Sequence, residues 1–135
     1  MSLVERLKDR LVGLPAVRLA VVFGSVARGD ERPGSDVDVA VRLDTDSSAL
    51  RQEVEVELGR AAGRELDIVF LDEAPPLLRF EIATDGVVLV ERQPHAWADF
   101  RMHAMIDWWD WAPTARKMEE AALERLRASV ADGQG

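Results

Sequence analysis

Cysteine is absent from this 135-residue sequence, and histidine occurs only twice, as His95 and His103. Without cysteine the chain can form no disulfide bond and offers no thiolate for a zinc or iron–sulfur centre. Two histidines are too few for a histidine-rich metal site, and we assign them no role. These two classes of metal site are therefore excluded.

Basic residues are scarce relative to acidic ones. Seventeen lysines and arginines stand against 25 aspartates and glutamates, a formal net charge of −8 at pH 7. Because a protein that grips a nucleic-acid backbone normally offers a basic surface, we expect no stable binding of nucleic acid. The acidic surface would suit a basic protein partner, and a solvated surface explains the same charge equally well.

The sequence also lacks any apolar run long enough for a membrane-spanning helix, so we expect no membrane contact. Residues 1–15, MSLVERLKDRLVGLP, carry charges throughout, which is not typical of a signal or transit peptide. We therefore expect a cytoplasmic protein. The length predicts a single domain, residues 1–135, around one hydrophobic core.

Apolar spacing and turn residues predict an α/β domain, with a sheet within about residues 17–91 and a helical C-terminal part within about 94–130. Strands are expected over residues 17–23, 36–43, 65–71 and 87–91. Helices are expected over residues 2–12, from an N-cap among residues 44–46 to about 62, over 75–83, and over about 94–111 and 114–130. Pro113 should separate the last two helices.

Two aspartates open the second predicted strand, in the stretch VVFGSVARGDERPGSDVDVAV, residues 21–41. Strand side chains repeat every second residue, so Asp36 and Asp38 should project from the same face. Two such charges repel by about 4 kcal/mol at 4 Å with an effective dielectric of 20. Mg²⁺ prefers carboxylate and phosphate oxygens, and two such ions suit a nucleotidyl transfer. The pair therefore predicts a metal site.

The glycine-serine pair before these aspartates suggests a phosphate-binding turn. Gly24 allows a sharp turn after the first strand, and Ser25 with the following amides can bond anionic oxygens. Arg28 and Arg32 lie in the same loop, and either could neutralise a triphosphate; one of them can equally be an ordinary solvated arginine.

A two-metal site usually requires a third carboxylate, and Asp67 in ELDIVFL is the best candidate. An acid among apolar strand residues needs an explanation. In two-metal chemistry the third acid can share the metal nearest the nucleophile and take its proton. Asp44 and Asp72 are weaker rivals, because solvated acids are common at strand ends.

The spacing Gly-Ser, ten residues, Asp-x-Asp resembles the signature of the polymerase-β-like nucleotidyltransferases, over about residues 17–71. The resemblance implies a small mixed β-sheet with helices on one side, Mg²⁺ as cofactor and a nucleotide such as ATP as substrate. It implies metal-binding, catalytic roles for Asp36, Asp38 and Asp67. It also implies nucleotide binding at positions that match the form GSxARG…SDxD, namely Gly24, Ser25, Arg28 and Ser35.

Within that superfamily the short chain looks most like the minimal nucleotidyltransferase (MNT) proteins paired with HEPN-domain toxins, and its FRMHAMIDWWDWAP segment is similar to their C-terminal helix. This resemblance implies an antitoxin that transfers AMP from ATP to a tyrosine of the HEPN RNase. Since this chain has no tyrosine, that acceptor must come from another chain. The alternatives are a non-catalytic antitoxin that acts by binding and a nucleotidyltransferase for a small molecule.

The C-terminal part carries an aromatic stripe at helical spacing. Its members are Trp97, Phe100, Ala104, Trp108 and Trp111, with Trp109 to one side. Packing on the sheet and burial in a partner both explain such a stripe. A second apolar face, which includes Met118, Leu126 and Val130, is expected to pack on the domain, with a dimer or partner contact as the alternative.

Overall fold

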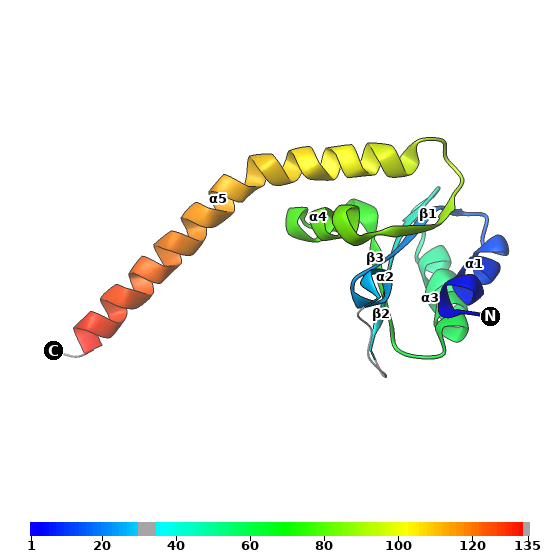
Figure 1. The fold of residues 1–135 in the computed structure, drawn as a ribbon, viewed down its shortest axis with the longest axis horizontal. Helices are drawn as coiled ribbons and strands as arrows, with labels where there is room; N and C mark the ends of the chain where they lie inside the picture. Colours follow the sequence, from blue (N-terminus) through cyan, green and yellow to red (C-terminus); the bar gives the residue numbers. More distant parts are fainter. Residues whose placement is uncertain (30–34, 134–135) are drawn as a thin grey trace.

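The computed structural model describes residues 1–29 and 35–133. Its strands form one mixed sheet (Figure 1), and their order in the sheet is β3-β2-β1-β4. The strands are β1 (Val17–Phe23), β2 (Val37–Leu43), β3 (Leu66–Phe70) and β4 (Val87–Glu91). β1 pairs antiparallel with β2 and β4, whereas β2 and β3 are parallel. The expected small mixed sheet is confirmed.

Helices cover both faces of this sheet. On one face, α1 (Leu3–Val12) and α3 (Ser48–Ala62) bury residues such as Leu7 and Leu58 against β1 and β2. On the other face, α4 (Pro76–Asp85) and α5 (Ala96–Gly133) bury Ile82 and Phe100. The family resemblance implied helices on one side, whereas the structure has them on both. A central strand that is apolar on both faces, as β1 is, requires cover on both.

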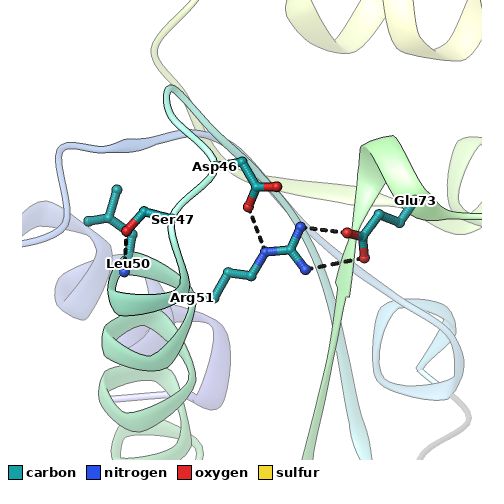
Figure 2. Close-up of polar contacts among 5 residues, drawn as sticks. All are labelled: Asp46, Ser47, Leu50, Arg51 and Glu73. Carbon is teal, nitrogen blue, oxygen red and sulfur yellow. Dashed lines mark hydrogen bonds and ion pairs between the residues drawn. The ribbon is translucent and has the colours of Figure 1, made fainter.

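The start of α3 differs from expectation in its cap. The N-cap is Ser47, whose hydroxyl accepts the Leu50 amide at 3.4 Å, and no residue of 44–46 takes that position. Asp46 instead accepts a bond from Arg51 Nε at 2.8 Å, and Arg51 also pairs with Glu73 (Figure 2). Glu73 belongs to the short helix η1 (Leu71–Glu73), so Arg51 ties the start of α3 to the end of β3.

The C-terminal segment is one helix, α5, and the predicted break at Pro113 was wrong. A proline inside a helix leaves the carbonyl four residues earlier, here that of Trp109, without its helical N–H. The Trp109 side chain is 70% exposed, so this part of the helix faces solvent, which can bond that carbonyl. The helix survives and changes direction along its length (Figure 1), as prolines commonly cause.

The two halves of α5 have different surroundings. The first half packs on α4, where the Trp108 ring stacks on Phe80 with centroids 5.1 Å apart. The second half projects away from the sheet (Figure 1), and Met118, Leu126 and Val130 are exposed. The expectation that this apolar face packs on the domain was therefore wrong. Within the described part of the chain, no helix has the length and apolar character needed to cross a membrane.

Candidate active site

The sheet brings two of the predicted acids together. Asp38 near the start of β2 is the register partner of Asp67 near the start of β3, and Phe23 at the end of β1 is its partner on the other side. Neighbouring strands lie about 4.8 Å apart, so the two aspartates are adjacent. Asp36 lies just before β2 and is exposed.

The acids repel one another across this short distance. The pKa of Asp38 is raised by burial first, and then by the negative charges of Asp67 and Asp36. The Arg28 guanidinium acts in the opposite direction and lowers the pKa of Asp38. Among the described residues, the negative neighbours of Asp38 thus act against the lowering effect of Arg28.

Gly24 lies directly against the cluster. It follows β1 with φ of 75° and ψ of −153°, a backbone conformation that is essentially confined to glycine. A Cβ atom at this position would lie 2.6 Å from Asp38 Oδ2. The residue must therefore be glycine both for its backbone and for the space that the carboxylate occupies. After it, Ser25 to Arg28 form the single turn α2.

Gly24, Asp38 and Asp67 line an open cavity of about 840 Å³. Of the predicted site residues, it brings together Gly24, Ser25, Arg28, Asp38 and Asp67. Asp36 and Ser35 lie next to this group in the sequence but are not part of the lining. Arg32 lies outside the described residues.

The two weaker candidates for the third acid lie elsewhere. Asp44 follows β2 and Asp72 follows β3, so both are at the opposite end of the parallel pair from Asp38 and Asp67. Each is near an arginine, Asp44 with Arg18 at 3.6 Å and Asp72 with Arg42 at 3.3 Å. The sheet therefore favours Asp67 as the third acid.

The far wall of the cavity comes from α4, which sequence reasoning missed. Leu78, Glu81 and Asp85 line it at the spacing of one helical face. Asp85 accepts a hydrogen bond from Arg28 Nη1 at 2.8 Å, which joins α4 to α2 across the cavity. No pattern in the sequence indicated that this helix face meets the Gly-Ser loop, because the contact joins residues far apart in the chain.

The side chains at this site are of the kind that binds a divalent cation, but their arrangement supports such a site less well. Oxygen ligands are available from Asp38, Asp67 and the nearby Asp36, and their mutual repulsion would be relieved by positive charge. Among the residues that the structure describes, however, no three acidic or histidine side chains are placed to hold a metal ion together. A metal role for these aspartates therefore stays a prediction.

A small mixed sheet with two adjacent aspartates beside a glycine turn is the arrangement that the resemblance to polymerase-β-like nucleotidyltransferases implies. Residues 5–95 match the family described as "Polymerase beta, Nucleotidyltransferase". The match covers more than half of the chain, and the chain belongs to this family. The superfamily predicted from the Gly-Ser and Asp-x-Asp spacing is confirmed.

Among known proteins, the chain is similar to the protein adenylyltransferase MntA of Shewanella oneidensis. The two are 31% identical over 86 residues, which are 63% of this chain and 60% of MntA. The chain therefore matches less than two thirds of the length of that relative.

Solved structures with the same fold cover more of the chain. One, described as a toxin-antitoxin with AMP-PNP, has a TM-score of 0.75 at 22% identity and covers 89% of this chain and 98% of that one. Another is a complex of a tri-AMPylated HEPN toxin of Shewanella oneidensis with its MNT antitoxin, with a TM-score of 0.68 at 20% identity and coverage of 89% and 98%. At these identities the likeness establishes the fold, including the C-terminal helix.

Proposed function

We propose that this chain is a Mg²⁺-dependent adenylyltransferase that transfers AMP from ATP to a hydroxyl, a tyrosine in our reading, of a HEPN-domain toxin and so acts as its antitoxin. The observation that carries the proposal is the meeting of Gly24, Arg28, Asp38 and Asp67 in one open cavity. The relative MntA is named a protein adenylyltransferase, and a structure with the same fold is an MNT antitoxin bound to its tri-AMPylated HEPN toxin.

The residues of the cavity have different roles in the proposed reaction. The acceptor oxygen forms a bond to the α-phosphorus of ATP. The bond between that phosphorus and the oxygen that bridges to the β-phosphate breaks, and pyrophosphate leaves. Asp67, at the edge of the acid cluster, takes the proton of the acceptor hydroxyl. Gly24 and Ser25 allow the backbone to approach the phosphates, and Arg28 pairs with their charge.

The aspartates Asp36, Asp38 and Asp67 would hold the metal, in our reading two Mg²⁺ ions. Bound there, the ions would neutralise the carboxylates, polarise the α-phosphate and lower the pKa of the acceptor hydroxyl. Ser35, directly before Asp36, would complete the nucleotide contacts.

The acceptor must reach the cavity from another molecule. The chain contains no tyrosine of its own, and the cavity is open rather than enclosed. The acidic surface would attract a basic partner.

The test is the intact mass of the adjacent gene's product after co-expression with this protein. A parallel co-expression uses the Asp36→Asn, Asp38→Asn variant. We expect mass increments of whole AMP units that are absent with the variant, and fragmentation then identifies the acceptor residue. An unmodified partner that co-purifies with both forms would favour an antitoxin that acts by binding alone. The absence of any partner would favour a small-molecule acceptor.

A further inference from the structure

The apolar side chains of α5 include a set with a seven-residue repeat. One series occupies positions 102, 109, 116, 123 and 130, and a second occupies 105, 112, 119 and 126. The apolar members of this set, the α5 stripe, are Met102, Met105, Trp109, Ala112, Leu123, Leu126 and Val130. The two series alternate at steps of three and four residues, which is the spacing of a coiled-coil seam. The pattern therefore predicts that this side of α5 packs lengthwise on another helix.

Most of the α5 stripe is open to solvent. Its members that are at least 48% exposed are Met102, Trp109, Leu123, Leu126 and Val130. Met105 is partly buried against the core beneath α5. α4 packs on a different side of α5, where the Trp108 ring stacks on Phe80. A row of large apolar side chains that is left exposed in this way is typical of a contact surface.

The seven-residue repeat has two polar positions, Arg116 and Glu119, midway between Met105 and Val130. Both side chains are exposed, and neither has a hydrogen bond or ion pair among the residues that the structure describes. A helix that packs along the stripe must therefore present a negative and a positive charge at the centre of an otherwise apolar contact.

A second copy of α5, running in the opposite direction, supplies both charges. In an antiparallel pair centred between residues 117 and 118, Arg116 of each helix faces Glu119 of the other. The same register sets Trp109 opposite Leu126 and Ala112 opposite Leu123, twice each. A parallel pair would instead set Arg116 against Arg116 and Glu119 against Glu119, which is repulsive.

The distribution of charge along the chain favours the same arrangement. From residue 113 to the C-terminus, four lysines and arginines stand against four aspartates and glutamates, so the net charge of −8 belongs to residues 1–112. Two domains with this charge repel each other when they lie side by side. An antiparallel contact over residues 102–130 is about 40 Å long at 1.5 Å per residue and places the two domains at its opposite ends.

We propose that α5 is a self-association surface, which pairs antiparallel with α5 of a second copy of this chain in a register centred on two Arg116–Glu119 contacts. The inference goes beyond the proposed function, because it holds whether or not the chain transfers AMP. It assigns a contact to the second half of α5, which projects away from the sheet (Figure 1).

The first experiment is sedimentation velocity of the full chain over a range of concentrations at low salt. We expect a dimer whose fraction rises with concentration. Arg116→Glu sets like charges opposite each other at both contacts and should raise the dissociation constant about tenfold. Lys117→Glu makes the same change of charge one residue away, outside the repeat, and should leave the constant within about twofold. A chain that is monomeric at every concentration, or equal effects of the two variants, would overturn the inference.

A charge exchange tests whether the two residues face each other. The double variant Arg116→Glu, Glu119→Arg restores opposite charges in exchanged order and should recover the dissociation constant of the unaltered chain. A double variant that dimerises as weakly as Arg116→Glu would show that Arg116 and Glu119 do not meet, and the inference would be wrong.

Introduced cysteines test the direction of the helices, since the chain has none of its own. Under mild oxidation, a mixture of Ala112→Cys and Leu123→Cys chains should form a disulfide-linked pair, and neither variant should do so alone. Linked pairs from Ala112→Cys alone would indicate parallel helices and contradict the register. If Arg116→Glu leaves the dimer unchanged but prevents co-purification of the adjacent gene's product, the stripe binds that protein and self-association is excluded.

Discussion

Asp38 of β2 and Asp67 of β3 are register partners on neighbouring parallel strands, 29 positions apart in the sequence by their numbering. Parallel pairing places the starts of both strands at the same edge of the sheet, next to the turn that follows β1. The negative charges of Asp67 and Asp36 raise the pKa of Asp38 beyond the effect of its burial. The fold therefore keeps these negative charges close together, although their mutual repulsion is unfavourable.

Replacing Asp38 with asparagine should stabilise the metal-free protein and abolish the proposed AMP transfer. An aspartate whose folded-state pKa is raised is destabilising when ionised, so the neutral amide should increase the free energy of unfolding by roughly 0.5–1 kcal/mol, after allowance for solvent screening. Urea denaturation at pH 7 with a chelator measures this change. AMP transfer should fall by more than about 100-fold, because loss of an indirect metal contact already costs 10–100-fold.

The opposite result would be equally informative. A variant that is less stable than the unaltered chain in chelator would mean that the Asp38 carboxylate is held by favourable contacts and not strained by its neighbours. Asp72→Asn, whose aspartate is exposed and paired with Arg42, serves as the control and should not gain stability.

Replacing Gly24 with alanine should damage the site through the backbone. The conformation of Gly24 costs other residues about 1–3 kcal/mol, and the new Cβ would lie 2.6 Å from Asp38 Oδ2. We expect lower stability by about that amount and loss of AMP transfer. The matched control is Gly59→Ala within α3, where a Cβ meets nothing within 4 Å and helix propensity predicts a gain of about 0.5–1 kcal/mol. Equal stability changes in the two variants would contradict the assignment.

The sequence predicted the part of the site that local spacing encodes. Alternation along β2 and the Gly-Ser turn after β1 are short-range patterns, and the structure places Gly24, Arg28 and Asp38 in one cavity accordingly. Asp67 was chosen as an acid among apolar strand residues, but its place beside Asp38 depends on the parallel pairing of β2 and β3, which no local pattern predicted. Asp85 and Glu81 were missed, because no periodicity marks which helix face will meet a distant loop.

Two errors in the helices have local physical causes. Pro113 was expected to end a helix, but it lies in an exposed stretch where solvent can bond the carbonyl that loses its partner. Ser47 was overlooked as a cap, because Asp44 and Asp46 are equally good capping residues by type. Asp46 is instead held by Arg51, a contact that depends on the position of α3.

Replacing Arg92 with alanine should destabilise the junction of α1 and β1. Its guanidinium donates to the carbonyl oxygens of Leu11, Leu14 and Val17 at 2.6–2.8 Å and so satisfies the end of α1. We expect a loss of about 2–3 kcal/mol in urea denaturation, since hydrogen bonds to charged groups are strong, although the Leu11 and Leu14 carbonyls keep their backbone partners. Arg92→Lys should recover only part of this, because a single ammonium cannot reach three carbonyls in the same geometry.

The neighbouring Arg18 provides the comparison. It pairs with Asp44 at 3.6 Å on the surface, and Arg18→Ala should change stability by less than about 0.5 kcal/mol. A loss as large as that of Arg92→Ala would indicate a general effect of removing charge from this region and would count against the carbonyl contacts.

The Arg51–Glu73 pair should make stability depend on pH below the neutral range. Hydrogen bonding to Arg51 lowers the pKa of Glu73 from its ordinary value of 4.5. Its contribution is therefore complete above the unfolded-state pKa and is lost as the pH falls through the lower folded-state value. Urea midpoints from pH 7 to pH 3 should show a smaller acid-induced decrease in Glu73→Gln than in the unaltered chain. Identical pH profiles, at low salt, would show that this exposed pair contributes nothing.

The adjacent tryptophans Trp108 and Trp109 allow the two explanations of the aromatic stripe to be separated. Trp108 stacks on Phe80 between α5 and α4, so Trp108→Ala should reduce stability by about 2–3 kcal/mol. Trp109 is 70% exposed, and Trp109→Ala should stay within about 0.5 kcal/mol of the unaltered chain. If the exposed part of α5 contacts the partner, Trp109→Ala should still weaken co-purification with the acceptor protein. Full co-purification with this variant would mean that the partner binds without contact to Trp109.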